Sequence, residues 1–229
     1  MIRECSLEDI WDGRTYGLND MVKADTGKCV GCHKCCTGMG TSIILDPYDV
    51  WVLKENLKMS FQELLDEKKL ELNMVDGLIL PNLCMGEEDR CTFLNKEGRC
   101  SIHSVRPGMC RIFPLGRVYD DEGFKYFLQK NECPRNNKSK VKVRKWIDVD
   151  NIEQNQKFIL TWHRFIRNIG NRVIKLKAQN QSESVNDIAM FVLNSFYISD
   201  FAVLDGDSIY NSIELRIEKA AKIIEDTFN

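Results

Sequence analysis

Four of the ten cysteines in this chain lie within eight residues, in the segment Cys29-Val-Gly-Cys32-His-Lys-Cys35-Cys36. A free cysteine packs like a small hydrophobic residue, but scattered buried thiols do not account for such a cluster. Thiolates three positions apart can bind one metal or one face of a cluster, and the loop between them can point N–H groups at the sulfurs. The C-x2-C-x2-C spacing, with a distant Cys133-Pro134, is typical of cubane ligands in bacterial ferredoxins, although a second ferredoxin motif is absent.

Cys35 and Cys36 are adjacent, and we expect adjacent side chains to diverge. Either one of them is a spare thiol, or the two bind neighbouring metal centres. Further cysteines follow at Cys84, Cys91, Cys100, Cys110 and Cys133. At least eight thiolates are therefore available, which suits two four-coordinate sites, whether these hold zinc or cubanes.

Basic residues flank the cysteines, and their charge would favour thiolate over thiol. Arg106 and Arg111 are the strongest candidates for cofactor binding, since each lies close to a ligand in sequence and can donate to sulfur or to backbone. His33 lies inside the first motif and could ligate, but we expect it to point outward. His103 is close to Cys100 and could donate a hydrogen bond to the ligands.

Composition places the protein among ordinary globular chains and predicts a cytoplasmic location. The net charge is -2 and the pI is about 6.0, so neither a nucleic acid nor a membrane is indicated as a partner. No apolar run reaches the roughly 18 residues of a membrane span, and the N-terminus lacks the pattern of a secretory signal. Disulfides are disfavoured in a reducing cytoplasm, so clustered cysteines there indicate metal or redox chemistry.

All the cysteines precede residue 134, which predicts a metal-binding domain over residues 1–145 and a helical region over 146–229. The basic stretch from Pro134 to Lys145 has the composition of a solvated connector. We expect a mainly α fold with a small irregular or β cysteine-rich part, on which the C-terminal helices pack.

Local signals predict the elements around the cysteines. Asp46-Pro47 begins a helix, and Ser60 with Glu63 forms a capping box. Residues 41–45 read as a short strand, and 117–119 with 124–129 as a β-hairpin. Apolar residues at helical spacing predict a long helix around 158–176, followed by two helices capped by Ser184 and Asp207.

The combined pattern resembles the YkgJ-type cysteine-cluster family, a zinc- or iron-chelating domain found mainly in bacteria and archaea. It covers about residues 25–135 and consists of Cys29-x2-Cys32-x2-Cys35-Cys36, Cys91-Thr-Phe-Leu, Arg99-Cys100-Ser-Ile-His103-x2-Arg106-Pro107-x2-Cys110-Arg111-x-Phe113-Pro114, and Cys133. The resemblance implies the shared ligands Cys29, Cys32, Cys35, Cys36, Cys91, Cys100, Cys110 and Cys133.

The same resemblance implies that Cys84 and Cys5 are extras. His103 stands where the family often has tyrosine, which argues against a required ligand there. The family includes enzymes similar to flagellin lysine methylases, on a longer chain. That activity is not carried over, because no glycine-rich nucleotide loop follows a strand in this sequence.

Three functions follow from these observations. The leading interpretation is an iron–sulfur protein, of the 4Fe–4S type, that transfers electrons, senses oxidants or supports a redox partner. The second is a zinc protein whose metal closes a loop-rich fold. The third is a cluster-dependent enzyme, although no hydrolytic triad, carboxylate pair or phosphate loop stands out.

Overall fold

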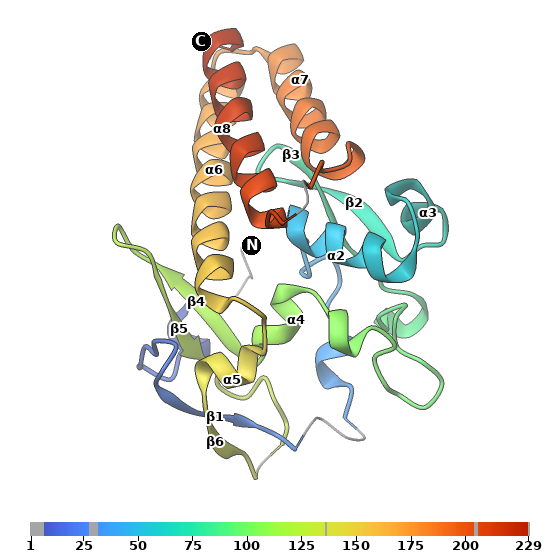
Figure 1. Ribbon diagram of the computed structural model, residues 1–229, viewed down its shortest axis with the longest axis vertical. Helices are drawn as coiled ribbons and strands as arrows, with labels where there is room; N and C mark the ends of the chain where they lie inside the picture. The colour runs from blue at the N-terminus through green and yellow to red at the C-terminus, as the bar shows by residue number, and fades with distance from the viewer. Residues whose placement is uncertain (1–6, 28–31, 136, 204–205, 229) are drawn as a thin grey trace. The chain divides into compact units, whose positions relative to one another are not determined.

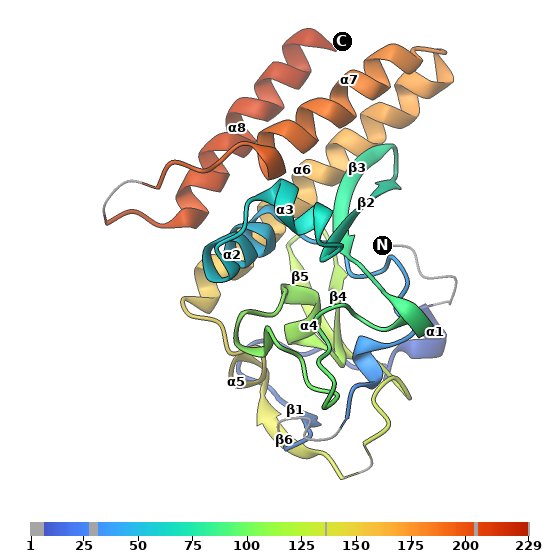
Figure 2. The ribbon, with the colours of Figure 1, turned by 90° about the vertical axis from the view of Figure 1, so that its right-hand side faces the viewer.

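The computed structural model describes residues 7–27, 32–135, 137–203 and 206–228, and the chain divides into two compact units (Figures 1 and 2). The first, here called the cysteine unit, comprises Met1–Ile44 and Leu83–Ile152. The second, the helical unit, comprises Leu45–Asn82 and Glu153–Asn229. Each unit is thus built from two separate stretches of chain. The domain boundary between residues 145 and 146 stays a prediction, since compactness does not test which segment folds alone.

Two small antiparallel sheets organise the cysteine unit. Strand β4 pairs with β5 in a hairpin whose register runs from Leu115 opposite Leu128 to Tyr119 opposite Phe124. The side chain of Asp120 accepts the backbone N–H of Gly123 at 2.8 Å and closes the turn. The elements of the unit are α1 Leu7–Ile10, β1 Met21–Asp25, η1 Lys34–Cys36, η2 Glu87–Asp89, η3 His103–Val105, α4 Gly108–Ile112, β4 Leu115–Tyr119, β5 Phe124–Leu128, β6 Ser139–Lys142 and α5 Val143–Ile147. The hairpin predicted over residues 117–129 is therefore confirmed.

Two other predictions for this unit are wrong. The stretch from Pro134 to Lys145 is not a plain connector, because β6 pairs with β1 and α5 follows at once. Val143 and Ile147 of α5 are buried in the core of the unit with Val22 of β1, and Val141 of β6 packs against this core. Residues 41–45 form no regular strand and contain only an isolated bridge position at Ile44.

The helical unit begins with two capped helices, as predicted. The carboxylate of Asp46 accepts the N–H of Asp49 at 2.8 Å, with Pro47 at the first helical position. The hydroxyl of Ser60 accepts the N–H of Glu63 at 3.2 Å in a capping box. The elements of the unit are α2 Pro47–Leu57, α3 Phe61–Asp66, β2 Leu70–Val75, β3 Leu78–Leu83, α6 Ile152–Ala178, α7 Ser182–Leu193, the π-helical turn η4 Asn194–Ile198 and α8 Ile209–Thr227; β3 and α6 each have one terminal residue in the cysteine unit.

Three long helices lie side by side in this unit, α6 and α8 parallel and α7 antiparallel to them (Figure 2). The Lys157 ammonium contacts the Glu214 carboxylate at 2.6 Å, and the Arg172 guanidinium binds the Phe228 carbonyl. The capping residues predicted for the last two helices are wrong. Helix α7 begins at Ser182, so Ser184 lies inside it, and Ser208 rather than Asp207 caps α8.

A tight hairpin turn places β2 and β3 against α6. Asp76 and Gly77 have φ angles of 51° and 83°, the left-handed pair that favours an Asp-Gly two-residue turn. A Cβ on Gly77 would collide with the Val173 side chain of α6. Glycine is therefore required here both for backbone conformation and for close approach.

Within the described residues, no helix is both long and apolar enough to cross a membrane. The fold combines helices with small antiparallel sheets, in line with the coarse expectation.

Candidate metal centre

The described end of the first cysteine motif, residues 33–36, forms a tight turn. Its 3-10 helix, η1, is closed by the N–H of Cys36, which donates to the His33 carbonyl at 2.8 Å. The turn presents Cys35 and Cys36 next to each other, both half-buried. Cys29 lies outside the described residues, so its predicted role as a ligand stays a prediction.

The thiols of Cys35 and Cys36 interact directly. The Cys36 thiol donates a hydrogen bond that lowers the pKa of Cys35 to about 7. The same interaction, together with burial, raises the pKa of Cys36 far above its ordinary value. Cys35 is therefore the thiol that ionises first, and the expectation that these adjacent side chains diverge is wrong.

The backbone joins this turn to the second cysteine motif, more than fifty residues further on. The N–H of Cys91 donates to the Cys36 carbonyl at 2.8 Å, and the N–H of Gly38 donates to the Asp89 carbonyl at 2.9 Å. A side-chain oxygen of Asp89 also accepts the N–H of Gly40 at 3.2 Å. These bonds fix the position of Cys36 relative to Cys91.

The second motif folds back on itself and contains three more thiols, those of Cys84, Cys91 and Cys100. The N–H of Thr92 donates to the Cys84 carbonyl at 3.2 Å, and an isolated bridge pairs Met85 with Cys91. A second bridge pairs Leu94 with Cys100. Two successive narrow loops therefore place Cys84, Cys91 and Cys100 near one another.

Together, the two motifs gather Cys35, Cys36, Cys84, Cys91 and Cys100, which we call the five-thiol group. Burial raises the pKa of Cys91, and the nearby thiols of Cys100, Cys35 and Cys84 raise it further. Burial likewise raises the pKa of Cys100, and Cys35 adds to the effect. The exposed fractions of Cys84 and Cys91 are only 9% and 8%. Cys35, Cys36, Cys91 and Cys100 thus lie within electrostatic range of one another, and Cys84 acts on Cys91. Cys84 and Cys91 are buried, and the other three are half-buried.

Arg106 is a positive charge that acts on this group. Its guanidinium lowers the pKa of both Cys35 and Cys100. Its Nη1 lies 2.5 Å from Nε2 of His103, and since arginine can only donate, that ring nitrogen is the acceptor. The buried Nε of Arg106 has no hydrogen-bond partner within the described part of the chain. This N–H remains available to an acceptor.

Arg111 and His103 have other surroundings. The guanidinium of Arg111 donates to the carbonyls of Asp148, at 2.9 Å, and of Ser104. Arg111 therefore binds backbone, one of the two roles predicted for it, and a contact with a cofactor stays a prediction. Partial burial, followed by the charges of Arg106 and Arg111, lowers the pKa of His103. A neutral His103 is consistent with its acceptor role toward Arg106.

The remaining predicted ligands are placed by local structure. Cys32 precedes η1, Cys110 lies in α4, and Cys133 follows the β5 strand, its carbonyl accepting the Lys138 ammonium at 3.2 Å. All three are half-buried. The interactions that define the five-thiol group do not include them. Among the described residues, no three His, Cys, Asp or Glu side chains converge closely enough to hold a metal ion.

The donor chemistry of the five-thiol group fits zinc or iron. Both metals bind cysteine thiolate, and zinc sites and iron–sulfur clusters are commonly built from four such ligands. Cys84 is the residue that sequence reasoning set aside, because the family pattern that the chain resembles does not include it. Its position beside Cys91 depends on the loop between them, which the spacing alone did not reveal.

Residues 28–144 match a family model named CxxCxxCC, described as "Putative zinc- or iron-chelating domain". The matched segment is more than half of the chain, and the protein belongs to this family. The resemblance inferred from the cysteine pattern is thereby confirmed, and with it a metal-chelating domain in general terms. No curated protein and no solved structure matches the chain.

Proposed function

We propose that this protein holds an iron–sulfur centre of the 4Fe–4S type, or two neighbouring metal sites, and exchanges electrons with a redox protein partner. The observation that carries the proposal is the five-thiol group. This group supplies four of the eight proposed ligands, Cys35, Cys36, Cys91 and Cys100. A single tetrahedral zinc site takes four protein ligands, so eight proposed thiolate ligands favour a polynuclear centre or a pair of sites. A reducing compartment such as the cytoplasm would keep these thiols free of disulfides.

The proposed ligands come from both motifs: Cys29, Cys32, Cys35, Cys36, Cys91, Cys100, Cys110 and Cys133. A bound cluster would supply a site that accepts and returns one electron. The chain would hold that site through thiolates and set its surroundings through burial and charge. Arg106 would offset part of the negative charge of the thiolates and donate its Nε–H to a sulfur. Arg111 would hold the backbone around the ligands in place.

A structural zinc protein is the second candidate, favoured by the architecture of residues 84–101. Only isolated bridges, turns and the short η2 helix order this segment. A metal that closes such loops contributes folding free energy directly. Under this interpretation the metal stabilises the cysteine unit, and the function lies in what the protein binds.

Elemental analysis of anaerobically purified protein separates these candidates. Iron and sulfide in near-stoichiometric amounts, with a broad optical band that bleaches on reduction, would support the electron-transfer proposal. Zinc alone, with no colour even after anaerobic reconstitution with iron and sulfide, would overturn it in favour of the structural site.

Cysteine variants test the ligand assignment. Cys91→Ser should lose metal, because Cys91 lies within the group and is tied by its backbone to the first motif. Cys5→Ser is the matched control and should retain full metal content. Cys84→Ser decides whether the fifth thiol is also a ligand, since metal loss there would add Cys84 to the proposed set. Unchanged metal content in Cys91→Ser would refute the assignment.

A further inference from the structure

Strands β1 and β6 lie side by side in the cysteine unit (Figures 1 and 2), and their sheet presents one face to solvent. Val22 pairs with Val141, and both contact the core of the unit. Because side chains alternate between the two faces of a strand, the residues on either side of this pair point away from the core. We call this exposed set the lysine face: Met21 and Lys23 of β1, and Lys140 and Lys142 of β6.

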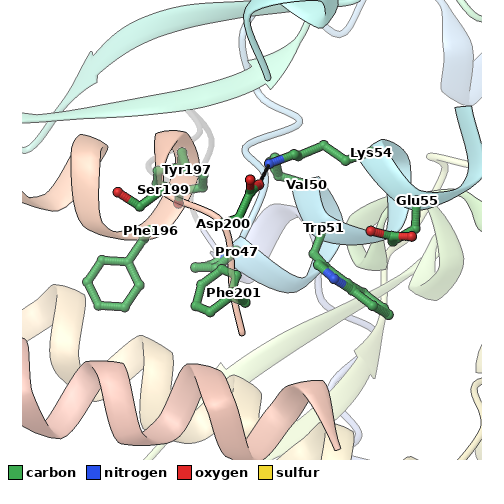
Figure 3. A pocket seen from close by; sticks show the side chains of 10 residues that line it. All are labelled: Pro47, Val50, Trp51, Lys54, Glu55, Phe196, Tyr197, Ser199, Asp200 and Phe201. Atoms are coloured by element: carbon green, nitrogen blue, oxygen red, sulfur yellow. Dashed lines mark hydrogen bonds and ion pairs between the residues drawn. The ribbon is translucent and has the colours of Figure 1, made fainter. Parts of the chain in front are cut away.

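The three lysines of this face have no paired carboxylate within the described part of the chain. Asp25, the acidic residue of these two strands, is already bound, because its carboxylate accepts the Ser139 hydroxyl at 3.1 Å and the Gly27 N–H at 2.9 Å. By contrast, the Lys54 ammonium of the helical unit pairs with Asp200 at 2.5 Å (Figure 3). Like charges on neighbouring strands repel each other, and an acidic partner would relieve this repulsion.

The lysine face begins beside one of the proposed metal ligands. The Lys138 ammonium donates to the Cys133 carbonyl at 3.2 Å, and β6 starts at the next residue, Ser139. Lys140 and Lys142 therefore follow a proposed ligand closely, along a stretch that this hydrogen bond and the pairing with β1 both hold in place. A protein docked on the lysine face would thus contact the strand that leads directly from Cys133.

The chemistry of the lysine face fits an acidic protein better than a nucleic acid or a membrane. The whole chain has a net charge of -2 and a pI of about 6.0, so it is not attracted as a body to an extended polyanion. Lysine ammonium groups are compact and strongly hydrated, whereas phosphate recognition favours the planar fork of arginine. The four residues of the face include no aromatic side chain on which a base could stack. A small group of opposite charges on a folded partner matches such a face.

We propose that the lysine face docks an acidic patch on a partner protein. The identity of that protein rests on the proposed function, under which it is the redox partner of the metal centre. Complementary charge would speed the encounter and orient the partner, and salt would screen it. Met21 is 48% exposed and lies directly opposite Lys142, so it offers an apolar contact between the charges. Encounters between redox proteins commonly bury a small area, which suits a face of this size.

A decaglutamate peptide that carries a dye at its N-terminus is the probe, and the full-length, metal-loaded protein is titrated into it. Fluorescence anisotropy reports the binding. We expect saturable binding with a Kd on the order of 1 mM at about 0.02 M salt. Raising the salt to about 0.3 M should weaken binding at least about tenfold, because the charges are then screened over a shorter distance. Binding that salt leaves unchanged would overturn the proposal.

Neutralising the lysine face tests its role directly. The variant that combines Lys23→Gln, Lys140→Gln and Lys142→Gln should bind decaglutamate about tenfold more weakly, because each exposed ion pair contributes severalfold at most. The salt dependence of the parent protein keeps the test valid if this variant does not fold. Self-association of the variant with unchanged peptide affinity would assign the lysines to protection of the strand edges, and would overturn the proposal.

A matched control combines Lys175→Gln on α6 with Lys219→Gln and Lys222→Gln on α8, where all three lysines are exposed. It removes the same charge from the helical unit and should keep the affinity of the parent. Equal losses in the two variants would show that only the net charge matters, against the proposal. Duplex DNA and phosphatidylglycerol vesicles represent the other classes of partner. If either binds at about 0.15 M salt in a way that needs the lysine face, and the peptide does not bind, the partner is not an acidic protein.

The peptide measurement is separate from the test of the metal centre. Loss of decaglutamate binding in protein that contains iron and sulfide would overturn the docking role of the lysine face and leave the proposed function intact. Zinc alone, together with peptide binding that needs the lysine face, would overturn the electron-transfer proposal and leave the face as a docking site for an acidic protein.

Discussion

Removal of the metal should release the η1 turn from the second cysteine motif. In the proposed centre, thiolates from both motifs bind the same metal site, so the metal connects two segments that are far apart in sequence. Without it, the connection depends on the backbone and on Asp89. The amide hydrogens of Gly38 and Cys91 donate across this junction and therefore report directly on whether it is closed.

The size of the effect follows from the bonds at the junction. Three hydrogen bonds cross it, from the N–H groups of Gly38, Gly40 and Cys91. At about 1 kcal/mol each, they hold the junction closed by about 3 kcal/mol, which slows exchange of these amides roughly a hundredfold. A structural metal contributes on the order of 10 kcal/mol more. In the loaded protein, exchange should then be limited by global unfolding, at least about a hundredfold slower again.

Hydrogen–deuterium exchange, read by mass spectrometry before and after chelation, measures this difference. We expect the peptides that contain Gly38 and Cys91 to lose at least about a hundredfold of protection on metal removal. Peptides from α8 around the buried Ile217 are the control and should change little. If protection at Gly38 and Cys91 is the same in metal-free protein, with metal loss verified by elemental analysis, no metal bridges the two motifs.

Three other perturbations have definite outcomes. Arg106→Gln should weaken metal binding about tenfold in a chelator competition, because a charge beside two of the thiols is lost; unchanged affinity would exclude Arg106 from the site. Tyr197→Phe should lower the free energy of unfolding in urea by about 1–3 kcal/mol, since the buried Leu45 carbonyl loses its donor, and a loss well under that range would contradict this. Lys54 holds the pKa of Asp200 below its ordinary value of 3.8, so the pair stabilises the fold above that pH and ceases to do so as the pH falls through the lowered pKa. Asp200→Asn should therefore melt slightly earlier than the parent at pH 7 and together with it in strong acid, and a gap that persists in acid would refute the assignment.

Local signals in the sequence were enough to predict the elements that depend on near neighbours. The caps at Asp46 and Ser60 were found because their partners lie three residues away. The Asp76-Gly77 hairpin carried an equally local signal and was overlooked. The pairing of β1 with β6 had no such signal, because its strands are more than a hundred residues apart. The basic stretch after Pro134 is folded because of this distant pairing, so its local sequence pattern did not predict its structure.

The candidate site, too, could be predicted from the sequence only in part. Residue type and spacing identified the cysteines and predicted metal chemistry, which the family assignment supports in general terms. Spacing could not show which thiols lie together, because that depends on the two narrow loops between Cys84 and Cys100. The spacing also could not assign different roles to Arg106 and Arg111. Arg111 binds two carbonyls, whereas Arg106 has a buried Nε–H still to be paired beside the thiols.

The adjacent cysteines now have a physical interpretation. Their thiols share a hydrogen bond, so Cys35 is prepared to ionise while Cys36 retains its proton. The Cys36 carbonyl is meanwhile held by the N–H of Cys91, which orients the turn toward the second motif. A metal that binds Cys35 would remove the acceptor for the Cys36 thiol, and deprotonation of Cys36 would then require a positive charge of its own. The metal itself, whether one ion or several, would supply that charge on binding.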